Sequence, residues 1–448
     1  MDLLTGSLWD KVLLFTLPIV ATNILQQLFN TADIAVVGQV VGNAPLAAVG
    51  CSGPIVTLFI TLFSGLAIGA NAVISRHIGA GDKGKVREAV HVSMAIAIIF
   101  GLLVMVVGES ITRPLLEIVG TPANVMNLAV KYLRIYFLGS VFLMLYNFEA
   151  AILRAGGDTR KPVLVLIVTG AVNIVLNLFF VIVCRMNVEG VALATLISNV
   201  LSAFILLRIL TQSENILQIR PKNIHLQKDV AKVILLIGIP AAIQGMLFNI
   251  ANIVIQSGVN SLGSDVVAGS TVGFNIEIFV YYIVAGFGQA SITFNSQNLG
   301  AGNLKRCAQA TRWCVGLGFI MTVIVSCLII GFREFLAGFF TSDETVIRIA
   351  VIRIMVLVSF EIFNMLNEVM SGTLRGLGYS ILPAFLSIFF VCGVRILWLL
   401  FIFPLNRTFE WLITVYPLSW IFTDISLILA YFLVKKRLYT QRIKEIEV

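Results

Sequence analysis

The chain has 448 residues, of which 58% are hydrophobic and only 12% are charged, and its mean hydropathy is +0.98. A soluble protein of this length carries about twice that share of charged residues, so the composition excludes one whose surface faces mainly water. Apolar runs such as 163–184 and 315–331 approach the length that crosses a bilayer. They are too long for barrel strands and do not alternate, so an all-α membrane protein is predicted.

Twelve apolar segments are predicted in chain order as transmembrane helices. They cover approximately 12–38, 46–75, 87–110, 123–152, 160–184, 189–212, 230–257, 265–297, 306–332, 345–373, 380–404 and 410–434. The longest link, 213–229, is polar and lies mid-chain. It is predicted to be a cytoplasmic linker between an N-terminal six-helix lobe, 1–212, and a C-terminal six-helix lobe, 230–434, with a basic cytoplasmic tail at 435–448.

The distribution of basic residues predicts how the twelve helices are oriented across the membrane. With the N-terminus in the cytoplasm, 22 Lys and Arg lie at cytoplasmic ends, and only Arg113, Arg185, Arg333 and Arg407 lie in external links. This follows the positive-inside rule and accounts for the net charge of +8. The basic residues follow the sidedness of the loops and form no single soluble face, which argues against a nucleic-acid partner. Both termini are therefore predicted to be cytoplasmic.

The sequence also repeats itself. "IGAGDKGK" at 78–85 returns in the second half of the chain as "LGAGNLKR" at 299–306. At the same or nearly the same offset lie the pairs Gly65 and Gly286, Pro162 and Pro383, Ser198 and Ser419, and Pro18 and Pro240. Each copy holds an even number of helices, so both enter the membrane from the same side. Two bundles related by a parallel pseudo-two-fold repeat are predicted, an arrangement typical of secondary transporters.

Motifs for other functions do not occur in the sequence. There is no P-loop, no HExxH and no CxxC, and the six cysteines stand singly beside apolar runs. Hence neither an enzyme nor a structural metal site is predicted, and no cofactor is expected.

Asp33 is the leading functional candidate in the first lobe, because a charge inside a span is costly. It shares about a third of the first helix's circumference with Asn23, Gln26, Gln27 and Asn30, a stripe expected to face the bundle interior.

Three more polar residues of this lobe join the candidate set. Asn173 and Asn177 lie one turn apart on the fifth span, and Thr195 lies on the sixth at similar depth. With a carboxylate they offer hard oxygen ligands suited to Na⁺, or a site that binds and releases a proton. The alternative is that the three neutral residues only hydrogen-bond between helices.

The second lobe lacks equivalents of these residues. Its candidates for a substrate cavity are Glu277, Glu361 and Arg395. Glu277 and Glu361 lie nearest the middle of their spans, where they can attract a cationic substrate or a second ion. An equally supported alternative is a structural pair with Arg395 or Arg353. Near the cytoplasmic ends, Glu149 and Glu368 are expected to pair with basic neighbours such as Arg154 and Arg375.

Several segments resemble the multidrug and toxic compound extrusion (MATE) family. They are "NTADIAVVGQVVGNAPLAAVG" (30–50), "GLAIGANAVISRHIGAGD" (65–82), "ILRAGGDTRKP" (152–162), "NIVLNLFFV" (173–181), "EGVALATLIS" (189–198), "GQASITFNSQNLGAGN" (288–303) and "GTLRGLGYSILP" (372–383). The resemblance implies the MATE/MOP-type fold and a cation-coupling site at Asp33, Asn173, Asn177 and Thr195. One branch of the family has Asp where this chain has Asn177, and this difference leaves both H⁺ and Na⁺ open as the coupling ion.

The expectation is therefore an antiporter that exports amphipathic, cationic organic compounds by alternating access. Gln26 and Asn30, beside Asp33, are further candidates for its substrate cavity. It is expected to be a monomer in the cell membrane, with membrane lipids and small organic cations as its partners. Three alternatives stay open. One is a flippase for lipid-linked precursors with a related fold, and another is a transporter of the major facilitator type, whose loop pattern "GAGDKGK" fits less well. The third is a channel or a membrane receptor that does not transport.

Overall fold

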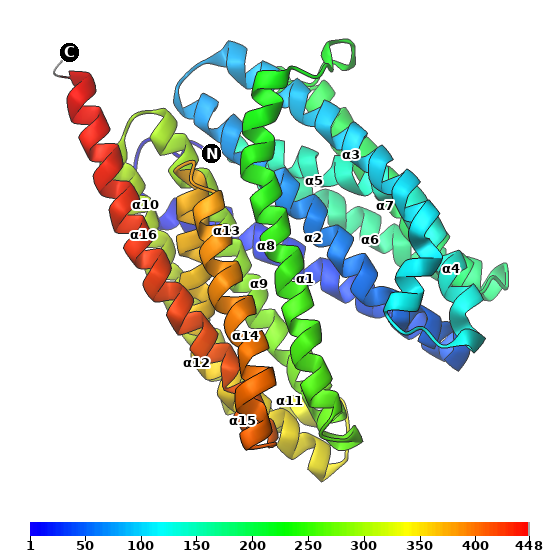
Figure 1. Ribbon diagram of the computed structural model, residues 1–448. Coiled ribbons are helices and arrows are strands. Elements are labelled where there is room, and N and C mark those ends of the chain that lie inside the picture. Colours follow the sequence, from blue (N-terminus) through cyan, green and yellow to red (C-terminus); the bar gives the residue numbers. More distant parts are fainter. Residues whose placement is uncertain (447–448) are drawn as a thin grey trace. The chain divides into compact units, whose positions relative to one another are not determined.

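The protein is described here from a computed structural model that covers residues 1–446, with the side chains of Asn43 and 442–446 left undescribed. Within residues 1–446 the regular structure is entirely helical (Figure 1). The first half contains α1 (Trp9–Val36), α2 (Asn43–Gly79), α3 (Lys83–Ile118), α4 (Ala123–Leu138), α5 (Ser140–Ala155), α6 (Arg160–Leu178) and α7 (Val188–Thr211). π-helical turns extend α1 through η1 (Val37–Val41) and α6 through η2 (Phe179–Val183).

The link after α7 holds one 3₁₀ turn, η3 (Pro221–Asn223). The second half contains α8 (Lys228–Asn260), α9 (Ser264–Gly300), α10 (Leu304–Gly331), α11 (Arg333–Gly338), α12 (Glu344–Gly376), α13 (Ile381–Ser387), η4 (Ile388–Gly393), α14 (Val394–Leu397), η5 (Trp398–Ile402), η6 (Phe403–Leu405), α15 (Phe409–Ile413) and α16 (Val415–Ile446). The elements from α13 to η5 form the eleventh predicted span with two π-helical stretches inside it.

The helices agree with the predicted spans. Within residues 1–446, ten helices are long and apolar enough to cross a membrane, and α4 and α5, bent by 46° at Gly139, make an eleventh candidate together. The 33-residue α12 corresponds to the remaining predicted span. The described part of the predicted basic tail, 435–446, continues the helix α16, because no Gly or Pro ends that helix after the predicted span. The tail's last two residues, Glu447 and Val448, lie outside the described residues.

The described chain forms two compact units. Unit 1 consists of Met1 and residues 21–242, and unit 2 consists of residues 2–20 and the described residues from 243 onward. The division falls inside α1 and α8, two residues after Pro18 and Pro240. The first part of each of these helices therefore belongs to the unit formed by the other half of the sequence.

The repeat is visible in the backbone as well as in the sequence. Gly81 and Gly302 both have positive φ, +72° and +68°, a conformation that glycine adopts without steric cost. In the first loop the Asp82 N–H donates to His77 O, and in the second the Asn303 N–H donates to Asn298 O. The next helix is then capped in the same way in both copies.

The capping side chains complete the match. Asp82 accepts a hydrogen bond from the Lys85 N–H at 3.0 Å, and Asn303 accepts one from the Arg306 N–H at 3.0 Å. The Lys85 N–H also lowers the pKa of the Asp82 carboxyl, because the bond favours its ionised form. Two further pairs of positive-φ glycines have the same spacing in the sequence as Gly81 and Gly302: Gly42 with Gly263, and Gly157 with Gly378.

Close helix packing in each unit depends on residues without side chains. In unit 1, a Cβ on Gly65 of α2 would lie 2.4 Å from the Cα of Ala242 on α8. In unit 2, a Cβ on Gly372 of α12 would lie 2.4 Å from the backbone oxygen of Gly288 on α9. Small residues at such contacts are typical of helices that pack in membranes, where close backbone approach contributes much of the association energy.

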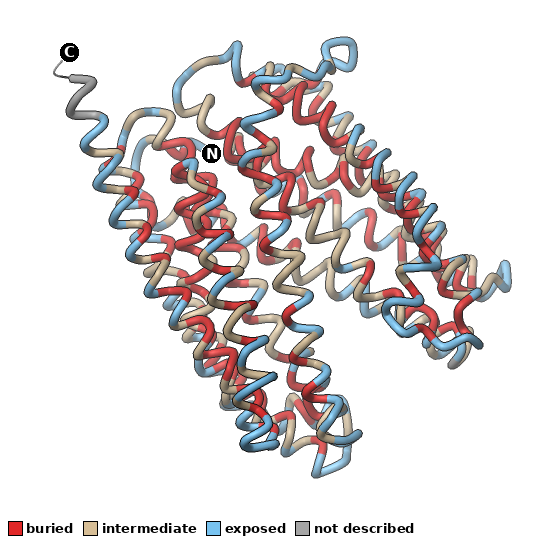
Figure 2. The backbone as a smooth tube through the Cα atoms, viewed as in Figure 1, coloured by how far each residue is buried: buried red, intermediate tan, exposed pale blue. Residues whose placement is uncertain are grey.

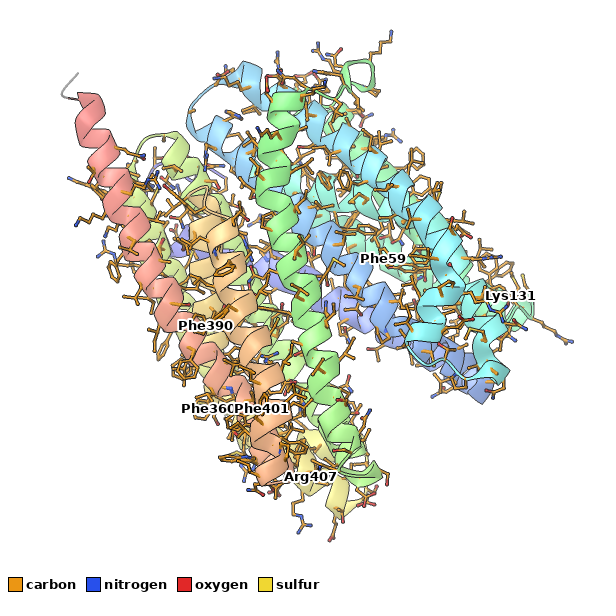
Figure 3. The ribbon with its side chains drawn as sticks, viewed as in Figure 1. Phe59, Lys131, Phe360, Phe390, Phe401 and Arg407 are labelled. Atoms are coloured by element: carbon orange, nitrogen blue, oxygen red, sulfur yellow. The ribbon has the colours of Figure 1, made fainter. Side chains whose placement is uncertain are left out.

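Many large apolar side chains are exposed on the outside of the helices. The buried residues lie mainly on the sides along which helices pack within each unit (Figure 2). Phe360 and Phe401, labelled in Figure 3, are 40% and 66% exposed. Such an apolar exterior suits contact with lipid chains.

Candidate functional site

Asp33 lies near the C-terminal end of α1, in unit 1, and is only 9% exposed. Its two nearest polar neighbours come from α6 and α7, which pack against each other. Asn173 and Asn177 of α6 are 5% and 0% exposed, and Thr195 of α7 is half-buried. The structure thus brings together all four residues predicted for the cation-coupling site.

Hydrogen bonds join the four side chains into one cluster. The Asn177 amide donates to Asp33 Oδ1, and the Thr195 hydroxyl lies 3.3 Å from Asp33 Oδ2. Asn177 Nδ2 also lies 3.2 Å from Asn173 Oδ1, and Asn173 Nδ2 lies 3.5 Å from Thr195 Oγ1. No basic residue takes part in these contacts, so the donors to the carboxylate are all neutral.

One oxygen of the cluster has no donor. Asn177 Oδ1 is buried and has no hydrogen-bond partner among the described residues. An amide oxygen left in this way beside a carboxylate is an additional ligand for a cation, or an acceptor for a proton carried by Asp33. The donor set therefore fits either H⁺ or a hard monovalent ion such as Na⁺.

A glycine brings α1 close to α6 beside this cluster. A Cβ on Gly170 would lie 1.9 Å from the ring of Phe29, so only glycine lets this ring pack against α6. Phe29 lies one turn before Asp33 on α1, and Gly170 lies about one turn before Asn173 on α6. The contact thus fixes the approach of the two helices that supply most of the cluster.

The other residues around Asp33 lie in more varied places. Asn30 is exposed and Gln26 is half-buried. Of the polar stripe predicted on the first helix, only Asp33 is buried in unit 1. Tyr132 of α4, 8% exposed, lies close enough to interact electrostatically with Asp33. Nothing in the sequence pointed to Tyr132, because a single tyrosine in an apolar helix matches no motif.

In unit 2, Glu277 forms a salt bridge with Arg353, as the structural alternative predicted. Arg353 Nε lies 3.0 Å from Glu277 Oε2, and Arg353 Nη2 lies 2.6 Å from Glu277 Oε1. Arg353 Nη1 donates to the hydroxyl of Ser270 at 2.9 Å. The two charged side chains are 6% and 13% exposed, so this is a buried bidentate pair that joins α9 to α12.

The other two candidates of unit 2 have mainly neutral partners. Arg395 of α14 donates to Asn252 Oδ1 at 2.7 Å and lies 4.2 Å above the ring of Tyr416. Glu361 of α12, 5% exposed, accepts a hydrogen bond of 2.6 Å from Asn364. Arg395 and Glu361 interact only at longer range.

The predicted pairing of Glu149 with Arg154 is wrong. Both carboxyl oxygens of Glu149 are buried without a hydrogen-bond partner among the described residues. Five residues along a helix correspond to about 140° around its axis, so the two side chains point in different directions.

Glu368 and Arg375 likewise form no ion pair among the described residues, and Arg375 donates instead to Gln244 Oε1 at 2.6 Å. These two residues lie seven positions apart, about 10 Å along the helix, which exceeds contact distance.

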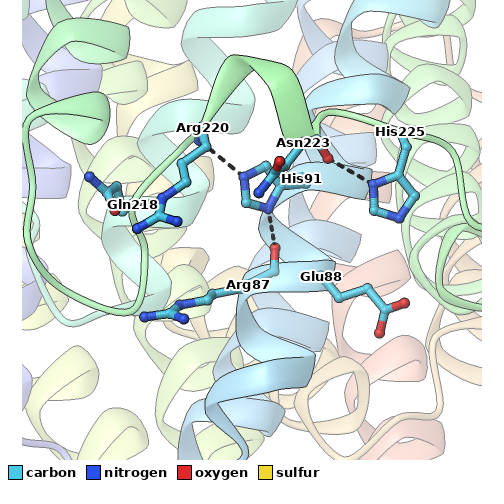
Figure 4. A pocket seen from close by; sticks show the side chains of 7 residues that line it. All are labelled: Arg87, Glu88, His91, Gln218, Arg220, Asn223 and His225. Carbon is cyan, nitrogen blue, oxygen red and sulfur yellow. Dashed lines mark hydrogen bonds between the residues drawn. The ribbon is translucent and has the colours of Figure 1, made fainter.

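A separate cavity of about 370 Å³ lies between the start of α3 and the link after α7, within unit 1 (Figure 4). Its lining residues are Arg87, Glu88, His91, Gln218, Arg220, Asn223 and His225. His91 Nδ1 lies 2.6 Å from Arg87 O, and its Nε2 accepts the backbone N–H of Arg220 at 3.0 Å. Nε2 thus attaches the link to α3, while the Nδ1 contact to Arg87 lies within α3 and orients the ring.

Comparison with known proteins shows where this fold and site belong. A sequence model of the MatE family matches the chain twice, over residues 18–179 and 240–399. The probable multidrug resistance protein YoeA of Bacillus subtilis is 27% identical over 398 residues, covering 87% of this chain and 86% of YoeA. The probable multidrug resistance protein NorM of Thermotoga maritima is 27% identical over 391 residues, covering 86% of this chain and 84% of NorM.

Solved structures agree on the fold. A MOP superfamily transporter from Pyrococcus furiosus superposes with a TM-score of 0.87 at 23% identity, covering 98% of both chains. A multidrug resistance MATE family transporter in an outward-facing conformation also gives 0.87 at 23% identity, covering 98% of this chain and 97% of the other. The two family matches correspond to the two copies of the repeat and decide against the major facilitator alternative. The chain is a multi-pass membrane protein and belongs to the MatE family of transporters.

Proposed function

We propose that the protein is a cation-coupled antiporter that exports amphipathic, cationic organic compounds across the cell membrane by alternating access. The single observation that carries this proposal is the buried cluster around Asp33. It combines one carboxylate, only neutral donors and an amide oxygen without a donor. A membrane protein maintains such a costly arrangement where a cation has to bind and leave.

The coupling step follows from the cluster's charge. When a proton or Na⁺ binds, it neutralises Asp33 and draws the oxygens of α1, α6 and α7 together. When the ion leaves, the carboxylate is charged, buried and without a cation. Because this state is costly, it favours a different packing of the same helices. A substrate cation that binds one packing better than the other is then exchanged for the ion.

The relatives support the substrate class in the proposal. YoeA and NorM are both described as probable multidrug resistance proteins, and MepA of Staphylococcus aureus, a multidrug export protein, is 23% identical over 366 residues. These names support diverse small organic compounds as substrates, and we propose that the compounds are cations. We further propose a monomer with both termini in the cytoplasm and with Gln26 and Asn30 near the substrate path.

The flippase alternative has less support. A phosphate-bearing lipid requires basic side chains that are free to bind it. The three buried arginines of unit 2 have other partners: Arg353 is bound to Glu277, Arg375 to Gln244 and Arg395 to Asn252.

Transport by the purified chain in liposomes tests the proposal. A fluorescent organic cation is offered under four conditions: a Na⁺ gradient alone, a pH gradient alone, both gradients and no gradient. We expect movement against the dye's own gradient only when one of the two ion gradients is present, and the active gradient identifies the coupling ion. Equal movement without either gradient would contradict the proposal, as would transport of anionic dyes alone.

A further inference from the structure

Asp424 of α16, in unit 2, is a buried carboxyl group with no bonding partner. It is 3% exposed, and neither Oδ1 nor Oδ2 has a hydrogen-bond partner among the described residues. Buried carboxylates in proteins normally accept hydrogen bonds or pair with a basic group. The Glu277–Arg353 pair of the same unit forms no hydrogen bond with this group.

Asn367 of α12 provides an unpartnered donor at the same level. Its Nδ2 is buried without a hydrogen-bond partner among the described residues. Met370 on α12 and Leu427 on α16 belong to one buried cluster. Asn367 comes three positions before Met370, and Asp424 comes three positions before Leu427. Because the two helices run in the same direction, the two side chains lie at one level.

Ser387 of α13 provides a second unpartnered group there. It is fully buried, and its hydroxyl has no partner among the described residues. The rings of Phe390 and Phe422 stack at 6.5 Å between the eleventh and twelfth spans, which run in opposite directions. Ser387 comes three residues before Phe390 and Asp424 two residues after Phe422, so both lie on the same side of the stacked rings.

No basic residue neutralises Asp424. Among the described residues no Lys, Arg or His forms an ion pair with it, because the buried arginines of unit 2 are bound to other groups. The charged groups on the packed elements are Glu344, Arg348, Arg353, Glu361, Glu368 and Arg375 on α12 and Arg395 on α14, and none of them forms an ion pair with Asp424 within the described residues. An ionised carboxylate left alone at this depth costs several kcal/mol, so a cation must accompany it.

We propose that Asp424, with Asn367 and Ser387, is a second site for a small monovalent cation, H⁺ or Na⁺. This inference rests on the proposed antiport and adds an ion to each transport cycle. Na⁺ would take the carboxylate and the Ser387 hydroxyl as ligands, and the free Asn367 N–H would donate to the carboxylate, because the Asn367 amide oxygen already accepts from Ser371 at 3.4 Å. A proton would bind Asp424 directly, and the two neutral side chains would hydrogen-bond to the acid.

Counting ions on the purified full-length chain tests this site. Bound ²²Na⁺ is measured at equilibrium, and proton release on addition of an organic cation is followed with a pH dye in weak buffer. We expect two ions for the unaltered chain and one for Asp424→Asn, whose side chain has the same shape but carries neither the negative charge nor the titratable proton. A count that is unchanged in Asp424→Asn overturns the proposal.

Three further variants make the outcome specific. Asp33→Asn is expected to bind one ion and the double variant none. If Asp33→Asn loses nothing while Asp424→Asn loses one ion, the Asp33 assignment fails and the Asp424 site stands. Ser387→Ala keeps the carboxylate and is expected to weaken Na⁺ binding about tenfold without changing the number of sites. Unchanged Na⁺ affinity in Ser387→Ala would overturn the assignment of this hydroxyl as a ligand.

Discussion

Removing Arg353 should leave the Glu277 carboxylate without a charged partner in the interior of unit 2. In Arg353→Met, the bidentate contacts of 3.0 and 2.6 Å to Glu277 and the 2.9 Å bond to Ser270 disappear. The carboxylate is only 13% exposed and has no other close basic partner among the described residues. Breaking a buried pair in this way costs about 3–5 kcal/mol, which is more than a hundredfold in the folding equilibrium.

The double variant Glu277→Gln with Arg353→Met is the matched control. It removes both charges and is expected to recover most of the loss, because replacing a whole buried pair is often close to neutral. Unfolding is followed in detergent by added sodium dodecyl sulfate, with helicity as the signal. The reasoning is refuted if Arg353→Met is as stable as the double variant, because the pair would then contribute nothing through its charge.

Two further predictions concern packing. Gly372→Ala should sharply reduce the amount of folded protein, because its Cβ would lie 2.4 Å from a backbone oxygen. Gly316→Ala is the control and should be tolerated, because no atom lies within 4 Å of the added Cβ. Size-exclusion profiles after expression compare the two variants, and equal yields of folded protein would contradict the packing. His91→Ala removes the ring that accepts the Arg220 N–H and contacts Arg87 O. Losing these bonds should destabilise the attachment of the link after α7 by about 1–3 kcal/mol and speed cleavage of the link by a protease. Cleavage at the normal rate would show that the contact does not hold the link.

The sequence predicted the helices and the repeat because both depend on local, repeated signals. Apolar length defines a span, and glycines at fixed offsets mark the turns, as Gly81 and Gly302 do with nearly equal φ values. The bend at Gly139 and the π-helical stretches in the eleventh span were not predicted, because they depend on packing against neighbouring helices.

The site was predictable to the extent that charge is rare in a membrane. Asp33 stood out for that reason, and two of the residues named with it, Asn177 and Thr195, do hydrogen-bond to it. For Glu277 the sequence left two partners open, and only the positions of α9 and α12 in space chose Arg353. Asp424 carried the same charge as Asp33 but no flanking polar stripe, so its unpartnered state appeared only in three dimensions.

The central claim is that a cation bound at Asp33 drives export. Gradient-driven export of a fluorescent cation from liposomes, compared between the unaltered chain and Asp33→Asn, tests it most directly. Asp82→Asn is the matched control, because Asn303 caps the equivalent helix of the second copy with an amide in place of a carboxylate. We expect Asp33→Asn to fall to the level of protein-free liposomes while Asp82→Asn transports normally. Full gradient-driven export by a correctly folded Asp33→Asn would contradict the account.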